Sequence, residues 1–556
     1  MNKSEKLICV VLGLVLAWYV FTSSKQTATQ AETPAAQEAQ SAEAPSADTQ
    51  AAEATTVDLQ PTPQAEAEPS APLPPEQLAT LENELVKLEF TTHGGALKKA
   101  TLKKYALKVG DVSEENPALE MDFSASPLGN LELNGAPMMA FEGAQVNGNT
   151  ITFENETLKK TFTLKEDYKL ELFEEVKGAA LGANRLSLGV VNMGLSKNDL
   201  LSVDSWAIDM KGGKVIHHCE GDSPLKAYLV GGVGGCSGSS NAANMPKETV
   251  IPVPGAQKYL ALKNRFFVSS LASSTDTMTG FVTKVTRDMS SSSYRPESVA
   301  SAAEFAALEK SRTTLFYVGP KKQALLWDLG MRDVMEFGMW RWVCYPLVWV
   351  LNLSHSMIPS FGIAIILLTI IVRLVFWPLT HKSTVGMKKM QELQPKMKAI
   401  QEKFKDNPQR LQQETWALYR DNKVNPMSSC LPMLVQIPVF IALFNVLRSA
   451  VELRYASFLW IADLSEPEGL LSAYLPFGGI NILPILMAAT MALQTALTPS
   501  TGDKNQQKMM MVFMPIMMLV MFYNFPSALS LYWTLSQVLS IVQMWMIRRR
   551  SNVAAK

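Results

Sequence analysis

One charged residue stands inside a long apolar stretch of this 556-residue sequence. Arg373 lies twelve residues after the start of residues 361–379, which carry no other charge. A charged side chain at the centre of a membrane helix costs about 2.5–3.5 kcal/mol on insertion scales. Two interpretations stay open: the long side chain reaches the nearer membrane surface, or it faces a hydrated cavity among helices, where it attracts polar or acidic chain segments.

Polar residues in other apolar stretches favour the second interpretation. Thr369 lies one helical turn before Arg373 and therefore shares its helix face. Further polar side chains occur in neighbouring stretches, namely Gln436, Gln494, Tyr532, Ser536 and Gln537. A single one would mean little, because polar side chains also hold membrane helices together. Contributions from several stretches indicate a shared polar binding site.

Five apolar stretches are long enough to span a membrane and to position these residues. They are residues 361–379, 430–447, 477–497, 509–525 and 528–547. Only Pro526 and Ser527 separate the last two, which predicts a tight helical hairpin. Seven methionines crowd residues 509–521, either as packing or as an adaptable surface for varied apolar substrates. We therefore expect a five-span α-helical bundle over residues 361–547 and a short basic tail over residues 548–556.

The segment 380–428 between the first two stretches carries ten Lys/Arg against five Asp/Glu. Apolar residues recur at helical spacing over residues 387–404, and a turn and a second helical pattern follow. This predicts a helical hairpin. Its basic side chains include Lys388, Lys389, Lys396, Lys398 and Lys403. The hairpin is either a linker with a hydrated face or a docking surface for a ribosome, a targeting factor or anionic lipid.

The chain begins with an apolar segment and a low-complexity segment. Residues 7–21 are uncharged and follow Lys3 and Lys6, which is typical of a signal sequence or a signal anchor. We expect residues 1–21 to remain as an uncleaved transmembrane anchor. Residues 22–84 are rich in Ala, Glu, Gln and Pro and bury too little apolar surface to fold. We interpret them as a disordered acidic tether.

Residues 85–318 predict a large all-β domain. Val86, Leu88 and Phe90 alternate with polar residues, and similar alternation recurs between Gly-rich turns. Such a pattern favours a β-sandwich. Residues 302–310 and 321–329 predict short helices. The linker 319–360 includes residues 338–356, whose tryptophans suit a helix lying in the membrane interface.

The net charge of zero, from 51 Lys/Arg and 51 Asp/Glu, is a sum of two opposite parts. Residues 22–340 hold 29 basic and 40 acidic residues, and the rest hold 22 and 11. By the positive-inside rule, residues 380–428, the basic tail and the N-terminus are cytoplasmic, and the acidic loop 452–480 lies outside. We therefore expect a multi-pass protein of a bacterial inner membrane, with its β-domain in the periplasm and both termini in the cytoplasm.

Enzymatic chemistry has no support in the motifs. The sequence has no Walker loop, HExxH or GxSxG pattern, so we expect no catalytic residue, cofactor or metal. His217, His218 and Cys219 lack a second ligand cluster, and we interpret them as a loop. Cys219 and Cys236 lie in the expected exported domain, where a disulfide is permitted. Whether they are bridged or free stays open.

Motifs in a fixed order along nearly the whole chain resemble the YidC membrane-protein insertase family, Gram-negative type. They are residues 88–95 (LEFTTHGG), 315–321 (LFYVGPK), 371–379 (IVRLVFWPL), 424–432 (VNPMSSCLP), 436–440 (QIPVF), 513–515 (FMP) and 525–529 (FPSAL). Related insertases act in mitochondria and chloroplasts. Each motif is weak alone, but their order and spacing are specific.

The resemblance implies an insertase and chaperone for inner-membrane proteins, with a β-supersandwich periplasmic domain. It implies a hydrophilic groove within the membrane in which Arg373 supplies the positive charge, beside Gln436, and Thr369, Tyr532 and Trp533 line a slide for the substrate. It implies nascent membrane proteins, the Sec translocon, a ribosome or signal-recognition machinery, and lipids as partners. The rival classes are a secondary transporter with a polar midplane site, which lacks support from repeated halves, and a structural anchor for the β-domain.

Overall fold

The computed structural model describes twelve stretches of the chain. They are residues 74–133, 139–192, 204–209, 214–218, 248–287, 296–335, 337–405, 407–422, 424, 431–470, 479–497 and 504–554. The chain divides into two units, Met1–Pro72 and Leu73–Lys556, and all described residues belong to the second. The expected anchor at residues 1–21, most of the tether, and both Cys219 and Cys236 therefore lie outside the described residues.

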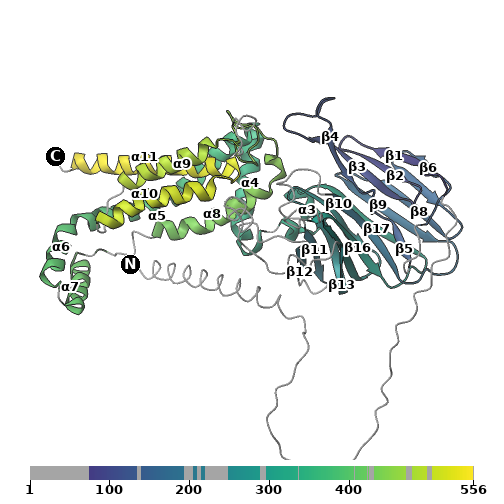
Figure 1. The fold of residues 1–556 in the computed structure, drawn as a ribbon, viewed down its shortest axis with the longest axis horizontal. Helices are drawn as coiled ribbons and strands as arrows, with labels where there is room; N and C mark the ends of the chain where they lie inside the picture. The colour runs from purple at the N-terminus through teal and green to yellow at the C-terminus, as the bar shows by residue number, and fades with distance from the viewer. Residues whose placement is uncertain are drawn as a thin grey trace, which may run out of the picture. The chain divides into compact units, whose positions relative to one another are not determined.

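Two antiparallel sheets make up the β-domain (Figure 1). The four-stranded sheet has the order β1–β2–β3–β4, with β1 (Leu78–Glu82), β2 (Val86–Thr91), β3 (Ala96–Ala106) and β4 (Ala118–Asp122). The larger sheet runs β5–β10–β16–β15–β13–β14–β17–β9–β8–β7–β6, and the β11–β12 hairpin joins it at β13. Its strands are β5 (Leu131–Leu133), β6 (Ala144–Asn147), β7 (Thr150–Glu154), β8 (Leu158–Leu164), β9 (Lys169–Val176), β10 (Asn184–Asn192), β11 (Asp204–Asp209), β12 (Lys214–His218), β13 (Glu248–Lys263), β14 (Phe267–Ser274), β15 (Met278–Arg287), β16 (Pro296–Phe305) and β17 (Ser311–Pro320).

The two sheets share an aromatic core. Phe90 of the small sheet packs against Phe162 and Phe153 of the large sheet, with ring centroids 4.9 and 6.4 Å apart. All three side chains are fully buried. Alternate residues of β8 point into this core, as the period of two in the sequence predicts. The prediction of an all-β domain is confirmed, and its inner faces pack as in a sandwich.

Two boundary predictions of the β-domain are wrong. Strand β1 lies within the expected tether, where it pairs with β2. Residues 302–310 do not form a helix, because residues 302–305 end strand β16 between β10 and β15. Ala303 and Phe305 are buried there. Pairing on both sides outweighs the helix preference of an alanine-rich segment, which is only a weak prior.

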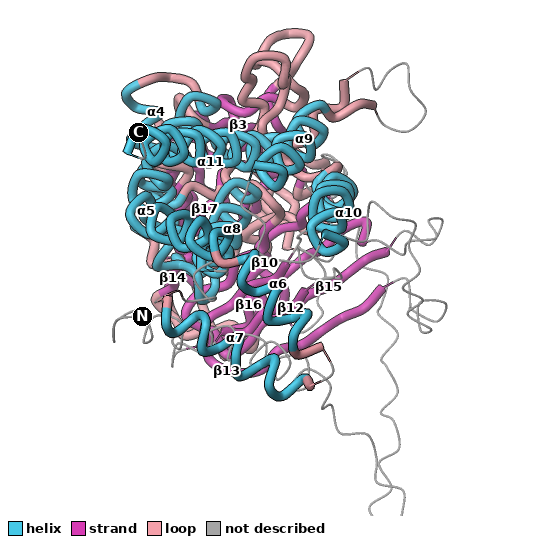
Figure 2. The backbone as a smooth tube through the Cα atoms, turned by 90° about the vertical axis from the view of Figure 1, so that its left-hand side faces the viewer, coloured by secondary structure: helices cyan, strands magenta, loops and turns pink. Residues whose placement is uncertain are grey.

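Helices follow the β-domain to the end of the chain. They are α3 (Gln323–Asp328), η3 (Arg332–Met335), η4 (Gly338–Trp340), α4 (Arg341–Met357), α5 (Phe361–Glu392), α6 (Gln394–Lys403), α7 (Pro408–Asp421), α8 (Leu431–Ser449), η6 (Val451–Leu453), α9 (Ile482–Leu497), α10 (Lys504–Phe522) and α11 (Ser527–Ala554). Helices α5, α8, α9, α10 and α11 lie together in one bundle (Figure 2). The C-terminal helical region is confirmed. Among the described residues, α5 alone is both long and apolar enough to cross a membrane, and the apolar parts of α8, α9 and α10 are shorter.

Two helical hairpins differ in detail from the sequence prediction. The short turn between α10 and α11 is present, but α9 packs against both helices. Residues 380–392 are not part of a separate hairpin, because α5 continues through Pro378 to Glu392. The break comes at Leu393, since Pro395 favours the first turn of a new helix. The charged hairpin consists of α6 and α7, which pack against each other.

Helix α4 has two different faces. Trp342 and Trp349 are exposed, while Cys344, Leu347 and Leu351 are buried. The buried face packs against α5 and α8. The predicted helix over residues 338–356 is therefore present, as η4 followed by α4, with an apolar surface left open on one side.

Candidate functional site

Arg373 points from α5 to α11. Its Nε donates a hydrogen bond of 2.8 Å to the hydroxyl of Ser536, and its Nη2 donates to the same oxygen. Ser536 is buried and Arg373 is half-buried. The guanidinium therefore lies against a neighbouring helix and is held by a neutral ligand. Among the described residues, no carboxylate lies within ion-pair distance of Arg373.

Two further predicted residues meet one helical turn away. Gln436 of α8 donates from Nε2 to the hydroxyl of Tyr532 at 3.2 Å. Tyr532 is buried on α11, four residues before Ser536 and on the same face. Arg373, Gln436 and Tyr532 thus come from three helices and contribute to one polar region.

The other two predicted residues have different surroundings. Thr369 is buried and donates to the carbonyl of Ile365 in its own helix at 2.6 Å. Trp533 packs against Phe440 and Phe522, with ring centroids 5.2 and 5.4 Å away. Trp533 therefore lies in an aromatic cluster that joins α8, α10 and α11. In the described part of the chain, the Thr369 hydroxyl donates its proton within α5 and not to another helix.

A second polar link between α5 and α11 was missed in the sequence. Gln543 donates from Nε2 to the hydroxyl of Thr380 at 3.0 Å. Both residues lie seven positions beyond the Arg373 and Ser536 pair, which is about 10.5 Å along each helix. The shared spacing of seven was a usable signal, because it marks one face of a packed helix pair. Gln537, which the sequence did single out, accepts a hydrogen bond of 2.8 Å from Thr490 of α9.

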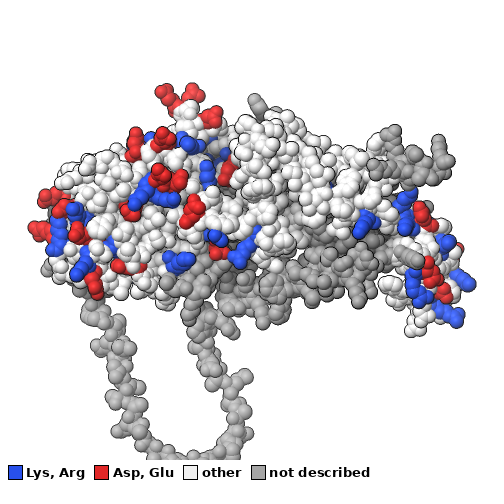
Figure 3. All heavy atoms as spheres, turned by 180° about the vertical axis from the view of Figure 1, so that it is seen from behind, with Lys and Arg blue, Asp and Glu red and all other residues white. Residues whose placement is uncertain are grey.

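The α6–α7 hairpin carries Lys396, Lys398 and Lys403 of the predicted lysines, while Lys388 and Lys389 belong to the end of α5. Lys389, Lys396, Lys398 and Lys403 are exposed, and Lys388 is half-buried. Tyr419 holds the two helices together by donating to the sulfur of Met397 at 2.9 Å. On the face drawn in Figure 3, charged side chains gather over this hairpin and over the β-domain, while the helices between them are nearly uncharged. That is the charge distribution of helices that lie in lipid.

The described residues give no support for a metal site and do not test the possible disulfide. Among the described stretches, no group of three or more His, Cys, Asp and Glu side chains is placed to hold a metal. The backbone of His217 and His218 belongs to strand β12, so the predicted loop is wrong at these two residues. The possible Cys219–Cys236 bridge stays a prediction, because neither residue is described.

A large β-sandwich joined to a bundle of apolar helices, with a lone cation among neutral polar groups, is the architecture of a membrane protein that carries a water-soluble domain. Residues 353–554 match the family model described as 60Kd inner membrane protein, and residues 240–350 match the YidC periplasmic domain. The chain belongs to the YidC membrane protein insertase family.

Individual relatives agree with this assignment. Membrane protein insertase YidC of Syntrophus aciditrophicus is 32% identical over 86% of this chain and 86% of that protein. The insertase YidC of Syntrophobacter fumaroxidans is 45% identical over 44% of each chain. A solved structure described as an active YidC insertase covers 85% of this chain and 93% of its own, at 20% identity and a TM-score of 0.35.

Family membership confirms several expectations from the sequence. The chain is a non-enzymatic insertase of the inner membrane, its substrates are nascent membrane proteins, and its β-domain is periplasmic. The family and the function that the motifs indicated are therefore both confirmed.

Proposed function

We propose that Arg373, Gln436, Tyr532 and Ser536 form the polar part of a substrate groove, open to the cytoplasm and to lipid. The hydrated positive charge attracts the acidic or polar end of the segment that must cross the membrane. Partial hydration along the route lowers the cost of removing that segment from water. The apolar part of the substrate stays at the lipid side and becomes a membrane span.

The observation that carries this proposal is the neutral partner of Arg373. Ser536 orients the guanidinium through two hydrogen bonds without cancelling its charge. A structural ion pair would bring a carboxylate to the same place. Since no carboxylate is near among the described residues, the field of Arg373 is left to act on a substrate.

Trp533 and Thr369 complete the lining in this proposal. Trp533 offers a wide apolar surface beside the polar residues, against Phe440 and Phe522. A substrate helix can slide along such a surface because aromatic contacts require no fixed hydrogen-bond partner. Thr369 has its hydroxyl turned back to Ile365 and so adds little polarity to α5.

We further propose a topology and a set of partners. An anchor at residues 1–21 and five spans over residues 361–547 place both termini and the α6–α7 hairpin in the cytoplasm. The exposed lysines of the hairpin receive the nascent chain from a ribosome or a targeting factor, or contact anionic lipid. The periplasmic domain contributes a surface for the Sec translocon.

Insertion of paired substrates tests the groove. Arg373→Ala should weaken insertion of a substrate with an acidic translocated tail more than insertion of the same substrate with a neutral tail. Arg185→Ala on the β-domain, where the side chain is 49% exposed, is a matched loss of one arginine and should affect both substrates equally little. Equal losses with both tails in the Arg373→Ala protein would contradict charge attraction.

Arg373→Lys separates charge from geometry. If the positive charge alone matters, the lysine variant retains the preference for acidic tails. If the planar guanidinium held by Ser536 matters as well, the lysine variant loses part of the preference for acidic tails. The reason is that all donors of lysine sit on a single nitrogen atom. Depletion of the protein should leave one-span and two-span membrane proteins uninserted.

A further inference from the structure

The turn between β13 and β14 reaches from the periplasmic domain to the helical bundle. Asn264 shapes this turn, since its side-chain oxygen accepts hydrogen bonds from the backbone of Phe266 and Phe267 at 2.9 and 2.7 Å. Arg265 lies at the tip and is 1% exposed. Its guanidinium also lies 4.5 Å from the centre of the Phe266 ring. The turn therefore presents one pre-oriented, fully buried arginine to the bundle.

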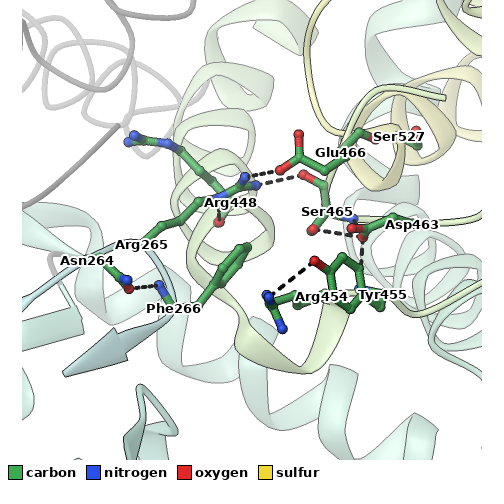
Figure 4. A network of polar contacts seen from close by, with 10 residues as sticks. All are labelled: Asn264, Arg265, Phe266, Arg448, Arg454, Tyr455, Asp463, Ser465, Glu466 and Ser527. Atoms are coloured by element: carbon green, nitrogen blue, oxygen red, sulfur yellow. Dashed lines mark hydrogen bonds and ion pairs between the residues drawn. The ribbon is translucent and has the colours of Figure 1, made fainter. Parts of the chain in front are cut away.

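Arg265 contacts three acceptors of the bundle (Figure 4). Nε donates to the carbonyl of Arg448 at 2.8 Å, and Nη2 donates to the carbonyl of Ser465 at 2.7 Å. Nη1 forms an ion pair of 2.6 Å with Glu466. Each of the three guanidinium nitrogens thus has its own acceptor, and these acceptors lie up to 201 positions away in sequence. Such a fork cannot be reproduced by a single-point cation.

One of these acceptors lies at the end of a helix that carries a groove residue, and another is hydrogen-bonded to the first residue of a second such helix. Arg448 is the penultimate residue of α8, the helix of Gln436. Glu466 accepts hydrogen bonds at its carbonyl from the backbone and the hydroxyl of Ser527, the first residue of α11, at 2.8 and 2.6 Å. Segment 464–466 is thereby held between Arg265 and the N-terminus of α11, the helix of Tyr532.

The same loop returns a second contact to the periplasmic domain. Arg454 donates to the carbonyl of Ala106 at 2.9 Å, and the hydroxyl of Tyr455 donates to the carbonyl of Leu107 at 2.9 Å. These carbonyls lie at the end of β3. Arg265 of the β-domain makes the first contact, and Arg454 and Tyr455 of the loop make the second. Two separate contacts resist rotation of the β-domain against the helical bundle.

Asp463 organises the loop between the two links. Its Oδ1 accepts from the backbone of Tyr455 and from the backbone and hydroxyl of Ser465, at 3.0, 2.8 and 2.7 Å. Burial raises the pKa of this carboxyl, while the hydrogen bonds oppose the rise. Tyr455 contacts the β-domain and Ser465 contacts Arg265, and both are hydrogen-bonded to the carboxylate of Asp463. A displacement of either residue is therefore transmitted to the other through Asp463.

We propose that Arg265 is a positioning residue for insertion: it clamps the periplasmic ends of α8 and α11 and so sets the distance between Gln436 and the Tyr532 to Ser536 face. This goes beyond a passive connection of two domains. It rests on the proposed groove, because the clamp matters for insertion only if the spacing of these helices matters. Arg265 itself touches no substrate.

Hydrogen exchange of the full-length protein in lipid nanodiscs tests the clamp directly. Arg265→Ala should raise amide exchange over residues 464–466 and 527–528 at least about tenfold, while the strands of the small sheet and α9 stay unchanged. Arg185→Ala is the matched control, because it removes an arginine that pairs with Glu304 at 2.9 Å on the surface of the same domain. This control should leave the exchange of both segments unchanged.

Insertion assays then test the positioning role. Arg265→Ala should slow insertion about five-fold or more, at the lower end of couplings between distant sites. Arg265→Lys should recover part of the rate, because it keeps the charge near Glu466 but cannot reach all three acceptors. Glu466→Gln should slow insertion less than Arg265→Ala, since the two carbonyl contacts remain.

Each outcome decides the proposal. Unchanged exchange at both segments would overturn the clamp, and local loosening without slower insertion would overturn its role in positioning. The proposal would also be overturned if Arg265→Ala, Arg265→Lys and Glu466→Gln all raised amide exchange throughout the domain and the bundle. Arg265 would then contribute to general stability and not to the position of two helices. Failure of the groove itself is separately visible: Arg373→Ala would leave insertion of acidic tails unchanged, while the exchange result for Arg265 would stand.

Discussion

Arg373 and Ser536 are joined by two hydrogen bonds between α5 and α11, although 163 positions separate them in sequence. A guanidinium has five N–H groups, and this pair uses two of them. Among the described residues, no acidic side chain faces the other three. Ser536 thus fixes the orientation of the cation and leaves its charge and most of its donors to a substrate.

This relationship predicts a role for the Ser536 hydroxyl. Ser536→Ala should lower insertion of substrates with acidic tails by a few fold, since the charge remains but its orientation is lost. Ser540→Ala is the control, because that hydroxyl donates to the Ser536 carbonyl within α11 at 3.1 Å. Both variants are compared in the insertion assay with acidic and neutral tails. A larger loss in the Ser540 variant would argue against orientation by Ser536.

The second link between α5 and α11 predicts a measurable coupling. A double-mutant cycle of Thr380→Val and Gln543→Leu should give an interaction free energy of about 0.6 kcal/mol, as for other hydrogen bonds between membrane helices. Thermal unfolding in bicelles provides the measurement. Additive effects of the two substitutions would show that the 3.0 Å contact contributes no stability.

Gly362 predicts a steric limit at the start of α5. A Cβ at this position would overlap the ring and Cβ of Phe458 in the loop that follows α8. Gly362→Ala should therefore destabilise the protein by about 1–3 kcal/mol, even though alanine favours a helix. Gly178→Ala is the control, since no atom lies within 4 Å of its added Cβ. The unfolding temperatures of the two variants in detergent decide the matter.

Lys160 predicts a pH dependence of the periplasmic domain. It is fully buried and donates to the carbonyls of Gly94 and Gly129 at 3.0 and 2.5 Å. Burial lowers its pKa to about 8, against an opposing effect of Glu174. Between about pH 8 and 10.5 the unfolded chain holds a proton that the folded chain has released, so stability rises with pH there.

Substitution isolates this contribution from other titrating groups. Lys160→Met should remove about 3 kcal/mol of the rise in unfolding free energy across that window. Urea titrations of the full chain in mild detergent, at several pH values, provide the comparison. Equal slopes of stability against pH in both proteins would mean that Lys160 keeps an ordinary pKa in the fold.

Deletion of residues 90–310 predicts where the essential activity lies. We expect growth to be mostly retained when the helical bundle is kept, because the groove residues all belong to α5, α8 and α11. Insertion should nevertheless be slower, as in Arg265→Ala, because the deletion also removes Arg265. The loop around Asp463 then becomes hydrated, and its contacts with Arg265 are replaced by water. A loss of growth, with the shortened protein still present in the membrane, would move the essential function to the β-domain.

Local patterns allowed much of the fold to be predicted. The alternation around Phe90 predicted strands, and the charge-free run around Arg373 predicted a long apolar helix, because both depend on residues close in sequence. The errors also have local causes. Ala303 and Phe305 lie in a segment whose composition suits a helix, and only pairing with β10 and β15 makes it a strand.

The candidate site was predictable in part. Arg373, Gln436 and Tyr532 were found because polar residues are conspicuous in apolar stretches. Thr380 was missed because it lies just beyond the stretch 361–379, whereas Gln543 lies inside the stretch 528–547 and could have been found by the same rule. Arg265 was invisible for a different reason. An arginine in a β-turn of a water-soluble domain is ordinary, and nothing near it in sequence marks it as buried.

The sequence by itself determined the apolar helices, the all-β domain, the basic hairpin and the family, since periodicity, charge and motif order are local properties. Only the tertiary structure decided which polar groups meet. The bonds of Arg373 to Ser536 and of Arg265 to Glu466 span 163 and 201 positions. Such contacts depend on how packed elements face each other, and the free energy of that packing is distributed over side chains that no short segment contains.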